Sequence, residues 1–361
     1  MTLMRLMLII ALAMAFTASF VEAVTVVVDP GGGGDYDNIP EAVFNAGADD
    51  TVLVMPGIYA VVAGGTPGWP IPLDGETPTI LSDSGADVTT LEGDGSTAAF
   101  SVAEGANDAR LSIQGFTFTL QTEVIHRDYP SYPGGPVRFT DNVVTGPGGL
   151  DAGNGAGSLI ARNVFAGSGG AGITHGHSSG PESVIEDNEV SGYAYGIGAG
   201  ETTIVRRNHV HDCTECGVVA YGPLTAYDNL IENCAYTGFM LDGTAYLEGN
   251  TITGNGTGIG WPGALFNTPA GYVRLNDIYG NATNIAVPLI LGYSVEFDAT
   301  VNWWGTDDPE EIAEGIYDCN DEWGGNCCVI FTPWCTAPTP GCDPTAVSQS
   351  HSWGVIKALY R

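Results

Sequence analysis

Residues 247–259, LEGNTITGNGTGI, contain one complete unit of a pattern that runs through most of the chain. An apolar residue lies three positions before Asn250, another lies two positions after it, and a Gly-Ile pair follows at Gly258-Ile259. The Asn and its apolar neighbours return at intervals of 20 to 26 residues. The full series of Asn positions is Asn142, Asn163, Asn188, Asn208, Asn229, Asn250, Asn276 and Asn302.

This spacing predicts a solenoid, because a repeat of 20 to 50 residues is typical of stacked supersecondary units. The two apolar columns and the Gly-apolar pair supply three short strands per turn, and we expect a single right-handed parallel β-helix of about ten coils. The in-and-out alternation resets at each Asn, which indicates a tight corner there. We expect the Asn itself to take the left-handed conformation at this corner and its amide to bond to the Asn of the next coil.

The two ends of the solenoid are predicted to be capped. Upstream of the Asn series, weaker turns place Asp94 and Phe116 in the Asn position. Residues 38–47 combine a capping Asn, an early Pro and a closing Gly, which favours a short helix over the first coil. Residues 307–316 read as a short acidic helix, and the five cysteines between 319 and 342 favour a Cys-rich cap.

Composition limits the function classes. The chain has 361 residues, 52 Gly, a formal net charge of −32 and 44% hydrophobic residues. The hydrophobic share is large enough for a core, which argues against disorder. A charge of this sign is repelled by nucleic acids and by anionic lipid headgroups, so we expect neither as a partner.

Both termini carry features of an exported protein. Residues 1–23 have one cation, an apolar run and a small-residue cleavage pattern, which together predict a signal peptide and a secreted or cell-surface location. The sequence contains no later apolar stretch long enough to span a bilayer. Residues 343–361 form a Pro, Ser and Thr-rich linker and a final WGVIKALYR segment, which is either a sorting or docking tag or a disordered end.

Two longer segments resemble a known superfamily. GGGGDYDNIPEAVFNAGADDTVLVMPGIY at residues 31–59 looks like the N-terminal signature of right-handed β-helix proteins of the pectate-lyase-like superfamily. NTITGNGTGI and NWWG resemble the coil repeats of that superfamily, and the resemblance covers residues 24–305. It implies the fold and its right-handedness. Because these motifs mark the cap and the corners, they are poor guides to chemistry.

The eight cysteines favour disulfides over metal binding, because the protein is expected to be exported. Cys213 and Cys234 each lie five residues after their Asn and one coil apart, which predicts a disulfide between stacked strands. The five C-terminal cysteines are expected to pair among themselves. One of them, and Cys216, are left unassigned.

Candidate catalytic residues are few. On adjacent coils, His177 and Glu201 are candidates for a base and the residue that orients it. Asp151 and Asp242 are four coils apart, about 19 Å, which is too far for a pair of glycosidase carboxylates. The resemblance implies that a lyase would need a free Arg near calcium-binding Asp residues and an esterase a close Asp pair. The sequence matches neither pattern, so it leaves enzymatic activity undecided.

Candidate metal ligands come from two places. His209 and His211 point outward on one strand with Glu189 and Glu232 on the neighbouring coils, a set that suits a transition metal or an ordinary charged ladder. The acidic segments 307–311 and 318–322 are candidates for calcium, although neither has EF-hand spacing. We therefore expect no cofactor other than a candidate Ca²⁺.

Charged and aromatic residues point to a binding role. Asp141, Arg162, Asp187, Arg207 and Asp228 alternate in sign from coil to coil, which predicts complementary ladders rather than free charges. Tyr195, Tyr221 and Trp261 lie on or beside the Gly-Ile strand, together with Tyr193 and Tyr236, where they suit sugar stacking or cover apolar side chains.

Two hypotheses follow from the sequence. The first is a secreted or surface protein that binds an extracellular glycan or has a structural role, with a neutral glycan favoured by the net charge of −32. The alternative is a polysaccharide lyase or glycoside hydrolase.

Overall fold

The structure is a computed structural model. It describes residues 22–73, 75, 77–102, 110–119, 122–127, 135–176, 180–261, 269–287, 295–321 and 327–342. Almost all of the expected signal peptide, the tail 343–361 and His177 lie outside the described residues.

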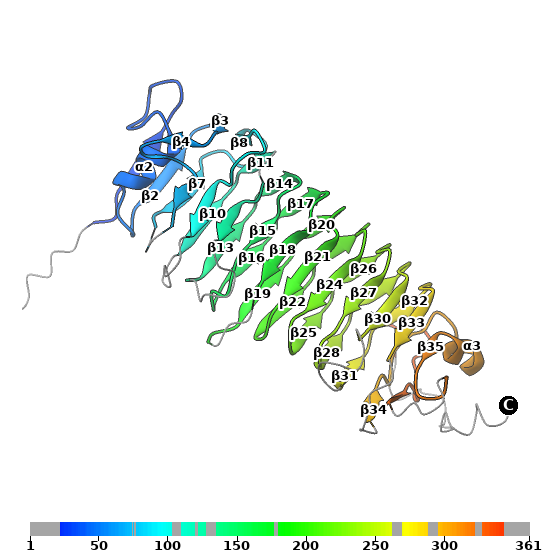
Figure 1. The fold of residues 1–361 in the computed structure, drawn as a ribbon. Helices are drawn as coiled ribbons and strands as arrows, with labels where there is room; N and C mark the ends of the chain where they lie inside the picture. Colours follow the sequence, from blue (N-terminus) through cyan, green and yellow to red (C-terminus); the bar gives the residue numbers. More distant parts are fainter. Residues whose placement is uncertain are drawn as a thin grey trace, which may run out of the picture.

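Three long parallel sheets run side by side along one axis and form a β-solenoid of about ten turns, which confirms the predicted fold (Figure 1). Sheet 1 contains, in stacking order, β1 (Thr25–Val28), β2 (Thr51–Val54), β7 (Thr79–Ser82), β10 (Leu111–Gln114), β13 (Val137–Thr140), β16 (Leu159–Ala161), β19 (Ser183–Glu186), β22 (Thr203–Arg206), β25 (Leu224–Tyr227), β28 (Thr244–Glu248), β31 (Ala270–Arg274), β34 (Val295–Asp298) and β36 (Cys327–Ile330). Sheet 2 contains β3 (Gly57–Val61), β8 (Thr89–Gly93), β11 (Thr117–Thr119), β14 (Val143–Gly146), β17 (Val164–Gly167), β20 (Glu189–Ser191), β23 (His209–His211), β26 (Leu230–Glu232), β29 (Thr251–Thr253) and β32 (Asp277–Tyr279).

Sheet 3 carries the predicted Gly-apolar strands. It contains β15 (Leu150–Asp151), β18 (Ala171–His175), β21 (Tyr195–Ala199), β24 (Cys216–Ala220), β27 (Thr237–Met240), β30 (Thr257–Gly260), β33 (Thr283–Ala286) and β35 (Ile316–Tyr317). A three-stranded sheet of β6 (Ile71–Pro72), β9 (Phe100–Val102) and β12 (Ile125–Arg127) precedes it, and the short hairpin β4 (Gly64–Gly65) and β5 (Gly68–Trp69) lies near the first coils. The coils from β13 to β33 each contribute one strand to each of the three sheets.

The core is a set of apolar columns that run along the axis. In sheet 2 the register stacks Phe118 on Val144, then Phe165, and continues through Val190 to the later coils. These side chains are almost completely buried. Because burial of apolar area is the main favourable term in folding, the continuous columns hold the coils together.

The predicted Asn ladder is present at the corner between sheets 1 and 2. In a typical step, Asn208 Oδ1 accepts hydrogen bonds from the backbone N–H and the side-chain amide of Asn188, at 3.1 and 2.9 Å. Asn208 Nδ2 donates to the Ile185 carbonyl at 2.9 Å. The same contacts link the whole series from Asn142 to Asn302. The ladder thus satisfies buried backbone groups at every corner.

The left-handed residue of this corner was predicted at the wrong position. The positive φ belongs to the residue before each Asn, as at Asp141 (φ 59°), Arg162 (φ 57°) and Asp187 (φ 55°). The reason is that the Asn side chain must point inward to reach its neighbours, whereas the preceding residue makes the turn with its side chain in solvent. Upstream, Phe116 does occupy the Asn position, since its N–H donates to Asn142 Oδ1, but the register places Thr89 there rather than Asp94.

Both caps form as predicted. Helix α2 (Ile39–Asn45) begins at Asn38, whose side chain accepts a hydrogen bond from the Glu41 N–H at 2.9 Å, and α3 (Pro309–Glu314) begins at Asp308. The two helices lie at opposite ends of the solenoid (Figure 1). The C-terminal segment also adds β35 to sheet 3 and β36 to sheet 1. In the part of the chain that the structure describes, we find no helix long and apolar enough to cross a membrane.

Candidate functional site

The outer face of sheet 3 between β21 and β30 is the surface on which the sequence placed its aromatic residues. Two outward columns cross it: one passes from Tyr195 through Cys216 to Thr237, and the other from Gly198 through Val219 to Met240. Gly198 has no side chain to project from this face. The outer face of sheet 3 therefore has a shallow depression at Gly198.

Tyr221 lies over this depression. It follows β24 directly, and a Cβ atom at residue 198 would lie 2.9 Å from Tyr221 Cε2, so the ring leans back over Gly198 on the previous coil. The side chain is 50% exposed. Partial burial raises the pKa of its hydroxyl, and Cys216 adds to the effect. Tyr221 thus has one side against the sheet and a large part of its surface open to solvent.

Tyr195 and Tyr236 lie at the other end of the same strands. A hydrogen bond to Glu215 raises the pKa of Tyr195 to about 12 and holds its hydroxyl. The backbone N–H of Tyr236 donates to the Glu215 carbonyl at 2.9 Å, and the Tyr236 side chain is 65% exposed. The tyrosines Tyr195, Tyr221 and Tyr236 are called the Tyr221 face below.

Trp261 does not belong to this face. It is 7% exposed, packs against Phe297 with ring centroids 4.7 Å apart, and donates from its indole nitrogen to the Gly243 carbonyl at 3.2 Å. Tyr193 is also buried, with its hydroxyl donating to Gly148. Both rings are buried in the core. The prediction that Trp261 stacks on a sugar is therefore wrong, because its ring is not accessible to a ligand.

Glu201 lies beside Tyr221. It follows β21, and a Cβ atom at residue 222 would lie 2.6 Å from Glu201 Cγ, which places its side chain against the turn that follows Tyr221. Its predicted partner, His177, is outside the described residues. The hydrogen bonds between β18 and β21 continue to the bond from the Gly200 N–H to the His175 carbonyl, which is the last one before Glu201 and His177. The structure therefore leaves the proposed base and orienter as a prediction.

A buried polar cluster near the first strands of sheet 3 was not predicted from the sequence. Arg127 donates to the Asp151 carbonyl at 3.2 Å and to the Ala152 carbonyl at 3.0 Å, and its guanidinium is 3.9 Å from the Asp151 carboxylate. Burial lowers the pKa of both Arg127 and His175. Arg127 and Asp151 lie 24 residues apart on the neighbouring strands β12 and β15, a contact that the spacing of the repeat did not predict. Four strand steps separate the coil of Asp151 from that of Asp242, as predicted.

The predicted histidine cluster is present on sheet 2, but as pairs. His209 Nε2 is 2.8 Å from Glu232, His211 Nε2 is 3.6 Å from Glu189, and His211 Nδ1 is 2.7 Å from Asp212. The two imidazole rings stack with centroids 4.3 Å apart. Among the described residues no group of three or more such side chains is arranged to hold a metal ion. The described side chains therefore make pairwise contacts along sheet 2.

The acidic segments proposed for calcium are used for local structure. The Asp308 carboxylate caps α3 by accepting from the Glu310 N–H at 2.9 Å. Asp318 is 2% exposed and accepts from the Asn320 and Val329 N–H groups. Carboxylates bound to N–H groups in this way have fewer lone pairs left for a cation, and Glu322 lies outside the described residues.

The cysteines divide into two disulfides and four thiols. Cys319 is bonded to Cys328 and Cys335 to Cys342, so the C-terminal cysteines pair among themselves and leave Cys327 free, as expected.

The predicted bond between Cys213 and Cys234 is absent in the structure, where both are free and buried. The predicted stacking is nevertheless correct: contact with the Cys234 sulfur, together with burial, raises the pKa of the Cys213 thiol. The next coils carry Asn255 and Asn281 at this second corner, where Asn255 accepts from the Cys234 N–H.

The charge ladder on the outer corner is confirmed for the pairs Arg162–Asp141 and Arg207–Asp187. Arg162 binds Asp141 with two hydrogen bonds of 2.7 and 2.8 Å, and Arg207 binds Asp187 at 2.8 and 2.9 Å. Arg207 lowers the pKa of the Asp187 carboxyl. These charges neutralise one another and provide no free cation for catalysis.

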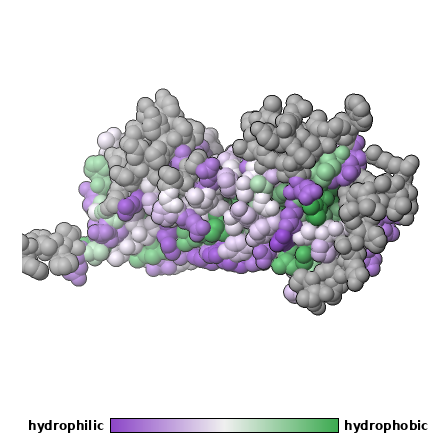
Figure 2. All heavy atoms as spheres, turned by 90° about the horizontal axis from the view of Figure 1, so that it is seen from below, coloured by the Kyte–Doolittle hydropathy of each residue, from purple (hydrophilic) through white to green (hydrophobic). Residues whose placement is uncertain are grey.

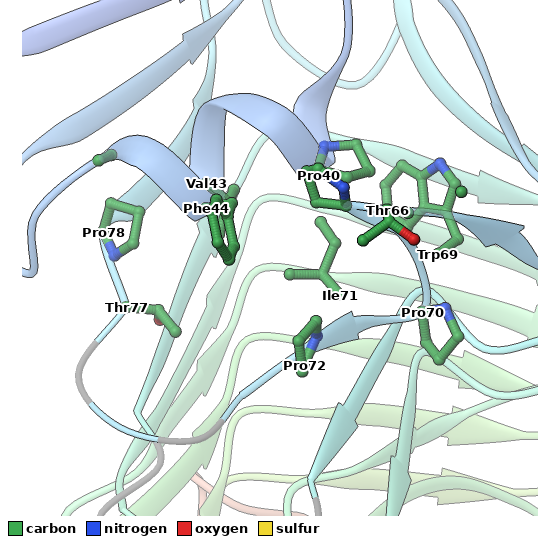
Figure 3. A pocket seen from close by; sticks show the side chains of 14 residues that line it. Pro40, Val43, Phe44, Thr66, Trp69, Pro70, Ile71, Pro72, Thr77 and Pro78 are labelled. Carbon is green, nitrogen blue, oxygen red and sulfur yellow. The ribbon is translucent and has the colours of Figure 1, made fainter.

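Two cavities lie away from sheet 3. The larger, of 660 Å³, is at the N-terminal end between α2 and the β4–β5 hairpin, where Figure 3 shows Phe44, Trp69 and several prolines around it. None of its described lining residues ionises, so it offers no acid or base. The other cavity, of 440 Å³, lies on the outer face of sheet 1 and is lined by Tyr227, Tyr246 and Tyr272.

Comparison with known proteins supports the fold. A family model described as right handed beta helix region matches residues 131–287, so the chain contains a right-handed β-helix region, as the resemblance implied. No curated protein sequence matches the chain.

Three solved structures are similar in fold. The catalytic domain of a GH87 alpha-1,3-glucanase in complex with tetrasaccharides has 13% identity and a TM-score of 0.42, covering 88% of this chain and 69% of that one. The same type of domain in complex with nigerose has 12% identity and a TM-score of 0.39, covering 88% and 68%. ORF18 of Geobacillus virus E2 has 11% identity and a TM-score of 0.32, covering 80% and 54%. These likenesses concern the fold alone.

Proposed function

We propose that this right-handed β-helix protein is secreted or held at the cell surface and binds neutral glycans along the Tyr221 face. The observation that supports the proposal is the position of Tyr221, which rests on Gly198 and is half exposed. A ring held against a sheet loses little conformational freedom when a sugar stacks on it, because the sheet already restricts its rotamers. Tyr236, 65% exposed, extends the aromatic surface across the neighbouring coils.

Charge supports a neutral ligand. The net charge is −32, and Glu201 and Glu215 border the Tyr221 face. An acidic polymer would be repelled unless cations bridged it, whereas carboxylates accept hydrogen bonds from the hydroxyls of neutral sugars. On the side shown in Figure 2, hydrophilic and weakly hydropathic residues cover much of the described surface, and a larger hydrophobic area lies toward the C-terminal end.

The experiment is titration calorimetry with a panel of neutral hexasaccharides, among them β-1,4-, β-1,3- and α-1,3-linked glucans, and with polygalacturonate in the presence and absence of Ca²⁺. We expect Tyr221→Ala to weaken binding of a neutral ligand about tenfold, the effect of removing one aromatic anchor. Gly198→Ala should weaken it too, because the added methyl group displaces the Tyr221 ring, the flexible partner in that contact. Tyr279→Ala, a tyrosine of sheet 2 that is 37% exposed, is the control.

Unchanged affinity in both Tyr221→Ala and Gly198→Ala would reject this site. Binding of polygalacturonate alone would reject the neutral class.

Export is part of the same proposal. The sequence features of residues 1–23 support cleavage before Val24, and those of residues 343–361 support a sorting or docking role. Sequencing the N-terminus of the exported protein tests the first point. A reporter fused to the tail, compared with and without residues 353–361, tests the second, and identical secretion of the two fusions would refute the tag.

Hydrolysis or lyase activity is the second candidate, and the contact of Glu201 with the turn after Tyr221 favours it. A carboxylate beside a sugar platform is correctly placed for a general acid or base. Reducing-end or unsaturated products that disappear in Glu201→Gln would establish catalysis. Binding without products would leave the protein as a glycan-binding module.

A further inference from the structure

The outer face of sheet 1 carries a second aromatic site, on a different sheet from the Tyr221 face. Its cavity of 440 Å³ spans three successive strands, β25, β28 and β31. This volume is within the range of small-ligand sites, roughly 300 to 1,000 Å³.

Two tyrosines form one wall of this cavity. The register places Tyr246 on β28 directly opposite Tyr272 on β31, and their rings meet edge to face with centroids 5.2 Å apart. Tyr246 is 41% exposed. Since cross-strand aromatic pairs hold each other's rotamers, this wall is formed before any ligand arrives.

Two arginines contact the tyrosine rings of the cavity. Arg206 donates to the Tyr227 hydroxyl at 2.6 Å and lies 5.7 Å from the ring centroid, while Arg274 lies 5.4 Å from the centroid of Tyr272. Each arginine is itself tied to a carboxylate, Arg206 to Glu186 and Arg274 to Asp298. One face of Tyr227 and one face of Tyr272 are therefore already occupied by a cation.

The floor and rim are polar. Glu248 is exposed and lies between Tyr227 and Arg274 in the register. Its carbonyl accepts a hydrogen bond from the Asn250 side chain, whereas its carboxylate has no ion-pair or hydrogen-bond partner among the described side chains. Asp228 lies against Gly249, where a Cβ atom would be 2.5 Å from its Oδ1, and that glycine has φ +69°. A residue with a Cβ atom at 249 would therefore require the Asp228 carboxylate to shift.

The C-terminal cap closes one side. Thr339 lines the cavity, and both its N–H and its hydroxyl donate to Asp277 Oδ1, at 2.8 and 2.6 Å. The same segment is held by the disulfide between Cys335 and Cys342. A wall with these attachments is pre-organised, which lowers the cost of binding.

We propose that this cavity is a second binding site for a neutral oligosaccharide, formed by Tyr246, Tyr272, Tyr227 and Glu248. An anionic ligand would face the carboxylates of Glu248 and Asp228, and a cationic one would find two ring faces already occupied by arginines. An uncharged polar ligand avoids both conflicts: its apolar ring face stacks on Tyr246, and its hydroxyls donate to the carboxylates. The proposal does not depend on binding at the Tyr221 face.

The test uses the full chain and the neutral hexasaccharide panel described above, by titration calorimetry. Wild type, Tyr221→Ala, Tyr246→Ala and the double variant are compared, with Tyr279→Ala as the matched control of similar exposure, 37% against 41%. We expect Tyr221→Ala to retain binding of at least one hexasaccharide, and Tyr246→Ala in that background to weaken the remaining binding about tenfold or more. Glu248→Gln, which keeps shape and fold, should weaken the same binding.

Other results would overturn the proposal. The first is that Tyr221→Ala binds no hexasaccharide at all. The second is that Tyr246→Ala and Glu248→Gln do not change the binding that remains in Tyr221→Ala. The third is that tetramethylammonium binds at this cavity and no hexasaccharide does. Normal binding in Tyr221→Ala that is lost in Tyr246→Ala would instead reject the Tyr221 face and retain this site.

Discussion

Replacement of Asn208 by Ala tests the idea that the Asn ladder holds the coils in register. The side-chain oxygen accepts two hydrogen bonds from Asn188, and the two N–H groups of Nδ2 are shared among three acceptors, the Ile185 and Arg206 carbonyls and Asn229 Oδ1, all at 2.9 to 3.1 Å. Alanine leaves the Asn188 N–H buried without its partner. An orphaned buried amide costs about 1–3 kcal/mol and each further lost bond roughly 0.5 to 1 kcal/mol, so we expect a loss of about 4 kcal/mol in the free energy of unfolding.

The assay is urea unfolding followed by far-ultraviolet circular dichroism, with Asn45→Ala as control. Asn45 makes one exposed hydrogen bond to the Glu41 carbonyl, and its loss should cost less than about 0.5 kcal/mol. Asn208→Asp keeps an oxygen that can accept from Asn188 but places a buried carboxylate against the Ile185 and Arg206 carbonyls, so it should destabilise at least as much as Asn208→Ala. A loss in Asn208→Ala below about 1 kcal/mol, no larger than that of the control, would refute the reasoning.

Three further predictions concern protonation and redox state. Burial lowers the pKa of His175, so below about pH 6.5 the unfolded chain binds a proton at this residue more readily than the folded protein does. The free energy of unfolding should therefore fall as the pH drops below about 6.5, and His175→Gln should make this pH dependence weaker. Arg207 lowers the pKa of Asp187, so this pair stabilises above about pH 4 and its contribution is lost as the pH falls further. Because both side chains are about 40% exposed, Arg207→Gln should cost less than about 1 kcal/mol, and an equal cost in high and low salt would argue against the ion pair. On oxidation, Cys213 and Cys234 should form a disulfide, whereas peptide mapping that links Cys213 to the C-terminal cysteines would contradict the stacking.

The repeat could be predicted from sequence because its causes are local and recur. Each coil needs an inward Asn at one corner and inward apolar residues on either side, so spacing alone identifies the ladder from Asn142 to Asn302 and the pairing of Arg162 with Asp141. The left-handed residue was assigned wrongly because spacing identifies a corner but not which of two adjacent residues makes the turn. In the first coils Thr89 occupies the Asn position. Without an Asn at this corner the spacing could not identify the correct residue, and Asp94 was assigned instead.

The candidate sites depended on the tertiary structure, because exposure and approach are not periodic. Trp261 and Tyr221 lie one position apart in the register. Trp261 continues the buried column of Ala220 and Leu241 and packs against Phe297. Tyr221 is half exposed, and its ring lies over Gly198 of the previous coil.

The cavity on sheet 1 is an even clearer case. One of its walls comes from Thr339, which is bound to Asp277, 62 residues earlier in the chain. A repeat determines which residues share a column, and it did so for most of this chain. What covers a column is decided by segments outside the repeat, whose contacts are long-range and leave no signal in the local spacing.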